Sequence, residues 1–270
     1  MTSTPPPFWR CFWIVLVITA LPASWCGAEQ VPVRYLEGVT HGFLVLRDQA
    51  QKSVATGDLE QIVKGTAVTS RLRLRFKDSS IYEETTLFSQ RGVFKVLSDH
   101  LLEKGPAFQN PMEVWIDRAK SQVKVRELKD GKNKITTHHM NLPGDLANGI
   151  VSVVVKNFAD NGPHTVEMLA ATPKPRIVKL EISPEGTDTF SIAGTRYNAE
   201  RYVAKVSIGG IAGAVAPLVG KQPPDTHIWI LRAASRGDAP AFLKSVGPLS
   251  SDNSVWEIEL ASPTWARKEQ

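Results

Sequence analysis

The chain has 270 residues, of which 42% are hydrophobic and 22% are charged, and its formal net charge at pH 7 is +5. This length is enough for one large domain with a sizeable core. The mild basic excess comes without a dense basic run interleaved with aromatic residues, which excludes a nucleic-acid partner. At most it favours peripheral contact with an anionic surface such as lipid headgroups.

The first 28 residues are typical of a secretory signal peptide. Arg10 precedes an apolar run from Cys11 to Leu21, which is too short to cross a bilayer comfortably. Ala28 fits the small-x-Ala rule for cleavage. We therefore predict a signal peptide over residues 1–28 and an exported protein, located in the periplasm or outside the cell. An uncleaved N-terminal anchor is the alternative.

The mature chain, residues 29–270, would contain no cysteine. Both cysteines of the sequence, Cys11 and Cys26, lie in the predicted leader, so disulfide bonds would not stabilise the domain in an oxidising compartment. Removing the leader also removes Arg10 and leaves a net charge of about +4. Because there is no internal repeat and no long linker, we expect residues 29–270 to form a single domain.

From His41 onward, strands and turns alternate at the short spacing of an antiparallel sheet. The clearest case is 70–76, where apolar residues alternate with three arginines. This alternation predicts one buried face and one solvent-exposed face. Turns are expected at Asp130-Gly131, as a hairpin, and at Pro184–Gly186. The expected strands are 42–48, 56–63, 70–76, 81–88, 93–102, 112–117, 122–128, 134–140, 165–171, 176–183, 202–208, 227–231, 242–246 and 255–260.

One segment departs from this β pattern. Asp145 is a candidate N-cap, and apolar residues from Leu146 to Phe158 lie near helical spacing. The run from Val151 to Val155 is β-branched, so its propensity disagrees with the capping signal. We predict a helix here, packed over one end or face of the sheet.

The stretch from Arg201 to Arg232 is expected to be the middle of the sheet. A strand leads to a Gly-Gly bend at Gly209-Gly210, and Pro223-Pro224 then stops strand pairing before His227 resumes it. The small apolar residues of 211–219 fit a buried strand or a tight loop. A loop that touches a membrane is the alternative.

No motif for a metal, a cofactor or a catalytic residue stands out. His138 and His139 are adjacent, so on a strand they point to opposite faces and cannot easily bind one ion. Gly220-Lys221 resembles the end of a phosphate-binding loop, but Val215 occupies the place of its first glycine. Glu83 and Glu84 fail as a carboxylate pair because they too face opposite ways, whereas carboxylates on neighbouring strands could still meet.

The candidate binding residues are few. Lys221, Asp225 and His227 form a polar cluster in an apolar, turn-rich setting, and Trp115 and Trp229 could line a pocket. A structural turn is the alternative for the polar cluster. Core packing is the alternative for the two tryptophans.

The order of elements resembles an uncharacterised family of exported bacterial β-rich proteins and, more distantly, the periplasmic lipoprotein carriers. A leader is followed by a long β meander, a Leu-Pro-x-Asp-Leu helix start at Leu142–Leu146, and more strands. The likeness to the carriers implies a strongly curved sheet that encloses acyl chains under helices at its mouth. This chain offers one good helix for such a lid.

We therefore predict a mainly β protein with a large curved antiparallel sheet, either a meander or an open half-barrel, and one short helix packed on it. The expected function is non-catalytic: a monomeric envelope protein that binds a lipid, an acyl chain or a protein partner through the curved sheet. Two alternatives stay open. One is an envelope assembly factor that uses the 211–224 loop or a sheet edge. The other is a hydrolase of envelope polymers, with Asp225 and His227 as its candidates.

Overall fold

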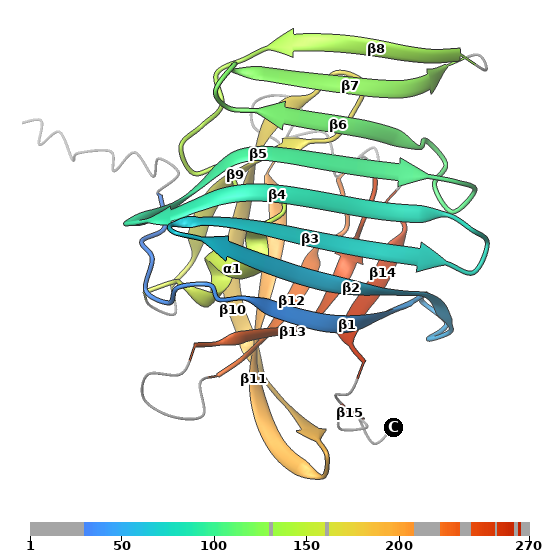
Figure 1. Cartoon of the computed structure of the whole chain (residues 1–270). Helices are drawn as coiled ribbons and strands as arrows, with labels where there is room; N and C mark the ends of the chain where they lie inside the picture. The colour runs from blue at the N-terminus through green and yellow to red at the C-terminus, as the bar shows by residue number, and fades with distance from the viewer. Residues whose placement is uncertain are drawn as a thin grey trace, which may run out of the picture.

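A computed structural model gives the fold of the chain (Figure 1). It describes residues 30–129, 132–159, 162–207, 222–232, 239–251, 253–261 and 264–265. The predicted leader, the Asp130-Gly131 turn, the 211–219 segment and Lys221 lie outside these described residues.

The described residues form one antiparallel sheet of fifteen strands and one short helix. The first eight strands are β1 (Thr40–Arg47), β2 (Ser53–Lys64), β3 (Ala67–Phe76), β4 (Ile81–Arg91), β5 (Val93–Lys104), β6 (Met112–Asp117), β7 (Gln122–Lys129) and β8 (Lys132–His139). The later elements are α1 (Val151–Lys156), β9 (His164–Ala170), β10 (Arg176–Ile192), β11 (Thr195–Ser207), β12 (Thr226–Leu231), β13 (Ala241–Pro248), β14 (Val255–Leu260) and β15 (Thr264–Trp265).

The hydrogen-bonded order of the strands is β15-β10-β11-β12-β13-β14-β1-β2-β3-β4-β5-β6-β7-β8, and β9 also pairs with β10. The two halves of the chain are joined where β14 pairs with β1, with Leu44 opposite Leu260. Figure 1 shows β9–β14 running behind the wall formed by β1–β5. The predicted large, curved and open antiparallel sheet with one short helix is therefore confirmed.

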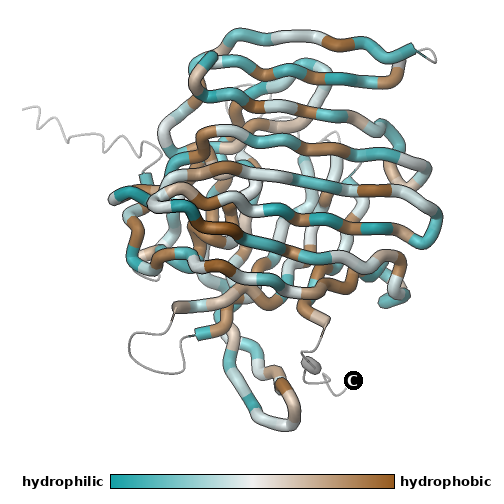
Figure 2. The backbone as a smooth tube through the Cα atoms, viewed as in Figure 1, coloured by the Kyte–Doolittle hydropathy of each residue, from teal (hydrophilic) through white to brown (hydrophobic). Residues whose placement is uncertain are grey.

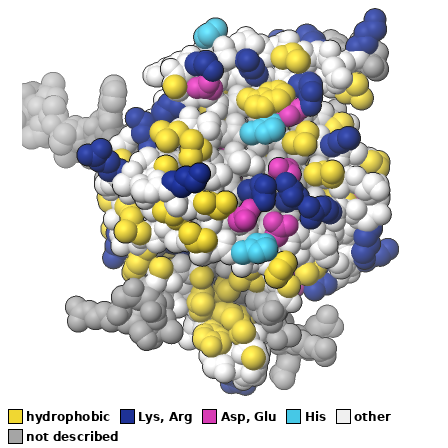
Figure 3. All heavy atoms as spheres, viewed as in Figure 1, with side chains coloured by type: hydrophobic (Ala, Val, Ile, Leu, Met, Phe, Trp, Pro, Cys, Tyr) yellow, Lys and Arg dark blue, Asp and Glu magenta, His cyan; other side chains and the backbone are white. Residues whose placement is uncertain are grey.

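Period-two alternation divides the side chains of β3 between the two faces of the sheet. Leu74 and Phe76 are buried, whereas Arg71 and Arg73 lie on the opposite face, each 2.6 Å from a glutamate of a neighbouring strand. Figure 2 shows hydrophilic and hydrophobic positions alternating along these strands, and Figure 3 shows the charged side chains gathered on the outer face. We call the face that packs on α1 concave and the face that carries these arginines convex.

Two predictions about the second half of the sheet are wrong. First, β11 and β12 lie near one edge of the sheet, because β14 pairs with β1 and all of β1–β8 extend the sheet on the far side. Second, Pro184–Gly186 is a bulge inside β10, and the chain turns at Ala193-Gly194 instead. Proline is tolerated at such a bulge because the ladder of backbone hydrogen bonds is locally disrupted there.

The helix is shorter than the sequence predicts. It spans Val151–Lys156, and Ile150, not Asp145, occupies its N-cap without a side-chain hydrogen bond. Val153, Val154 and Val155 are all buried. Burial of this β-branched run against the sheet therefore outweighs its weak helix propensity.

The segment before β1 fixes α1 against the sheet. The side-chain oxygen of the fully buried Asn157 accepts hydrogen bonds from the backbone N–H groups of Arg34 (2.8 Å) and Tyr35 (2.7 Å). Lys156 Nζ lies 2.6 Å from Glu37 Oε1. These contacts hold the end of the helix on the concave side, where the main cavity lies.

Candidate functional site

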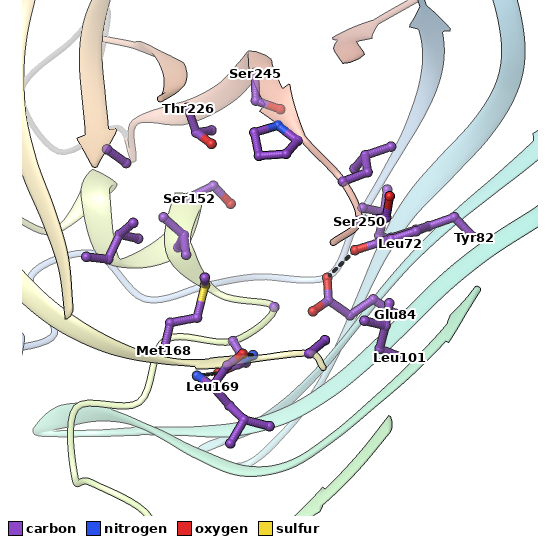
Figure 4. A pocket seen from close by; sticks show the side chains of 18 of the residues that line it. Leu72, Tyr82, Glu84, Leu101, Ser152, Met168, Leu169, Thr226, Ser245 and Ser250 are labelled. Carbon is purple, nitrogen blue, oxygen red and sulfur yellow. Dashed lines mark hydrogen bonds between the residues drawn. The ribbon is translucent and has the colours of Figure 1, made fainter. Parts of the chain in front are cut away.

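A cavity of about 500 Å³ lies between the concave face of the sheet and α1 (Figure 4). One wall comes from β1–β5, the other comes from β9–β14, and residues around Ser152 of α1 complete the lining. Most of the lining side chains are apolar, among them Leu72, Leu101, Met168 and Ile228. Both the volume and the lining fall within the range of small-molecule sites in proteins.

Short side chains explain why the interior is hollow at this point. Ser70, Ala204, Thr226 and Ser245 face the cavity from four different strands, and Ser152 faces it from the helix. Elsewhere on the concave face, bulky buried side chains fill the space and pack the core tightly. The cavity is thus a consequence of residue size at a few inward-facing positions.

Strands β4 and β5 bring three acidic side chains to the concave face. Their register pairs Tyr82 with Glu103, Glu84 with Leu101, and Thr86 with Asp99. We call Glu84, Asp99 and Glu103 the carboxyl cluster. Glu84 and Glu103 line the cavity directly, while Asp99 lies buried behind Thr86.

Hydroxyl groups hold two of these carboxyls in place. Tyr82 donates a hydrogen bond of 3.3 Å to Glu84 Oε2, as Figure 4 shows, and Thr86 Oγ1 donates one of 2.6 Å to Asp99 Oδ1. Gly149 lies so close to Thr86 that a Cβ at this position would overlap the Thr86 hydroxyl. The turn before α1 therefore closes the cavity over the carboxyl cluster.

Burial raises the pKa of Glu84 to about 8, and repulsion from Asp99 and Glu103 acts in the same direction, while the Tyr82 hydrogen bond opposes it. Burial likewise raises the pKa of Asp99 to about 6, against the lowering effect of its hydrogen bond with Thr86. At neutral pH, Glu84 is therefore mostly an uncharged acid. Strongly perturbed carboxyls in a cavity are typical of functional sites.

The residues that the sequence singled out do not line this cavity. His227 Nδ1 lies 2.7 Å from Glu185, and Trp229 Nε1 donates a 2.7 Å hydrogen bond to Asp188. Both alternate along β12 with Thr226 and Ile228, which do face the cavity, so both lie on the convex side. Asp225, just before the strand, lies 3.6 Å from Lys205.

Trp115 also lies away from the other candidates. It is on the convex face of β6, stacked on His100 at a ring-centroid distance of 5.1 Å, and Arg126 lies over its ring. The structure thus brings neither Trp115 and Trp229 together nor either of them to the cavity. Partner binding by Trp115, His227 and Trp229 stays a prediction.

The sequence did not identify the carboxyl cluster as a site. In the sequence, Glu84 stands out only as the neighbour of Glu83, which the structure places on the opposite face beside Arg73. The available signal was polar residues at alternate positions of an otherwise apolar strand face, namely Tyr82, Glu84 and Thr86. Their partners on β5 could not be found in this way, because a bulge shifts the β4–β5 register between Leu87 and Phe88.

Within the described part of the chain, no three His, Cys, Asp or Glu side chains are placed to hold a metal ion. In the same residues, no helix has the length and apolar character needed to span a membrane.

No protein-family model matches the chain, and no curated protein sequence matches it. Among solved structures, the chain is similar to a β-barrel-like protein of the domain of unknown function DUF1849 from Brucella abortus. The two are 9% identical with a TM-score of 0.43, over 86% of this chain and 100% of the other. A likeness this distant says nothing of what the chain binds.

Proposed function

We propose that the protein is a non-catalytic binding protein of the cell envelope that holds a hydrophobic ligand, such as a lipid or an acyl chain, between its curved sheet and α1. The observation that carries this proposal is the cavity of about 500 Å³, which the described side chains line but do not fill. Leaving such a space in a core is costly, because the lining atoms lose contacts. A ligand would restore those contacts.

The lining also suits an acyl chain on energetic grounds. Transfer of one methylene from water to an apolar site is worth about 0.8 kcal/mol, which corresponds to roughly a fourfold change in affinity. Leu72, Leu101 and Ile228 provide such surfaces on both walls. The predicted leader implies export, so the protein would encounter its ligand outside the cytoplasm.

Native mass spectrometry of the purified mature protein tests whether a lipid co-purifies. A calorimetric titration with a homologous series of alkyl ligands then tests the site. We expect the affinity to rise by roughly fourfold per added methylene until the cavity is full. A series with no chain-length dependence, together with no bound lipid, would refute the proposal.

A pair of variants locates the binding. Ser152→Phe would place a ring in the cavity and should weaken binding at least tenfold, an estimate of about 1.4 kcal/mol or more. Thr85→Phe is the matched control, since Thr85 alternates with the inward-facing Glu84 and Thr86 on β4 and so lies on the convex face. Equal effects of both substitutions would contradict binding in the cavity.

A further inference from the structure

We infer that the cavity prefers an amphiphile with a cationic polar end, such as an alkylammonium group, over matched ligands with a neutral or an anionic end. This inference rests on the proposed function, because it concerns the ligand of the same cavity. It adds the chemistry of the polar end, which the carboxyl cluster recognises.

The charged groups around the cavity are distributed unevenly. Glu84 and Glu103 line it at one place, with Asp99 directly behind. Among the described lining residues, Arg176 at the start of β10 is the only Lys or Arg. The lining side chains described from β1–β3, from α1 and from β9 and β11–β14 are uncharged.

Among the described residues, the groups around Glu84 in the carboxyl cluster are acids. The groups that act on Glu84 are Tyr82, Asp99 and Glu103, each of which is an acid. The groups that act on Asp99 are Thr86 and His100. The ring of His100 points to the convex face, where it stacks on Trp115. An ammonium group placed beside Glu84 would therefore lie among acidic groups and be attracted to those that are ionised.

An ammonium, an alcohol and a carboxylate end group would interact differently with the carboxyl cluster. An ammonium group would donate charge-assisted hydrogen bonds to the ionised form of Glu84, and such bonds are stronger than neutral ones. An alcohol would gain only a neutral hydrogen bond. A carboxylate would be repelled by Asp99, whose pKa of about 6 leaves it mostly ionised at neutral pH, because like charges in a low dielectric interact strongly.

Binding of a cation should also be coupled to proton release. Glu84 is mostly uncharged at neutral pH, so an ammonium group next to it would shift the carboxyl to its ionised form and release up to one proton. The affinity for a cation should therefore rise as the pH is raised through about 8. The affinity for an alcohol should not follow this trend.

The experiment compares decylamine, decanol and decanoate on the purified mature protein by calorimetry, at concentrations below micelle formation. We expect decylamine to bind at least about tenfold more tightly than decanol, and decanoate to bind most weakly. Titrations in buffers of different ionisation enthalpy should show proton release with decylamine alone.

Two variants connect the preference to the carboxyl cluster. Glu84→Gln should weaken decylamine binding by about tenfold and leave decanol binding within about twofold. Glu83→Gln, which changes the adjacent residue on the convex face, should leave both unchanged.

The outcomes separate the two proposals. If decanol or decanoate binds as tightly as decylamine, the cationic preference is overturned while the hydrophobic cavity stands. If none of the three binds, the proposed function itself fails. The comparison of the three ligands uses the unmodified protein, so it does not depend on the folding of any variant.

Discussion

Lys156 Nζ lies 2.6 Å from Glu37 Oε1, and only 11% of the lysine side chain and 5% of the glutamate side chain are exposed. This buried ion pair connects the last residue of α1 to the segment that precedes β1. We expect Lys156→Met to lower the free energy of unfolding by about 3–5 kcal/mol, because it leaves a buried carboxylate without its partner. Urea denaturation measures the change.

The control for this pair is an exposed one. Lys120 lies 2.9 Å from Asp117, with 70% of the lysine side chain exposed. Lys120→Met should leave stability almost unchanged, since ion pairs on the surface contribute little. Similar effects of the two substitutions would show that Lys156 is not a structural anchor for the helix.

Gly149→Ala should destabilise the protein through two separate effects. Its φ is +66°, which costs about 1 kcal/mol or more for a residue with a side chain, and the new Cβ would overlap Thr86. The matched control is Gly65→Ala, where φ is +62° and nothing lies within 4 Å of the added Cβ. The excess loss at Gly149, measured by denaturation, reports the steric contact of the new Cβ with Thr86 and Asp99.

Stability should fall as the pH is raised from about 4.5 to about 8. Over this range the unfolded chain ionises Glu84 while the folded protein keeps the carboxyl protonated, so the folded state binds more protons. Asp99 adds to the fall at the lower end of the range, below its pKa of about 6. Glu84→Gln should remove much of this pH dependence and stabilise the protein above pH 8, on the order of a few kcal/mol.

Glu83, the residue next to Glu84, should make stability depend on pH in the opposite direction. The hydrogen bond with Arg73 lowers the pKa of Glu83, so Glu83 contributes stability that is present above its unfolded pKa and lost as the pH falls. Glu83→Gln should therefore weaken the protein slightly at neutral pH, by less than about 1 kcal/mol. A Glu84→Gln variant that titrates like wild type would contradict the buried, uncharged state of Glu84.

Removal of either candidate tryptophan should leave the affinity for an alkyl ligand unchanged. Trp229 bonds to Asp188 on the convex face, and Trp115 stacks on His100 there, so neither contacts the cavity. Trp229→Phe and Trp115→Phe are to be compared with wild type by calorimetry. A loss of affinity in either variant would place ligand binding on the convex face and not in the cavity.

The sequence by itself determined that this protein is a large antiparallel sheet and which residues of most strands share a face. Alternation with a period of two, as in Leu72, Leu74 and Phe76 against three arginines, is a local property, and it needs no knowledge of distant partners. For the same reason, Glu83 and Glu84 were separated correctly, since adjacent residues of a strand always point apart.

Only the tertiary structure decided where the cavity lies and what faces it. The pairing of β14 with β1 joins segments about 200 residues apart, and it sets which face becomes concave. The bulge between β4 and β5 turns Asp99 and Glu103 inward, beside Glu84. Long-range pairing and register are collective outcomes of packing the whole sheet. The alternation of polar residues on β4 could therefore mark Glu84, but no local pattern could place Asp99 and Glu103 beside it.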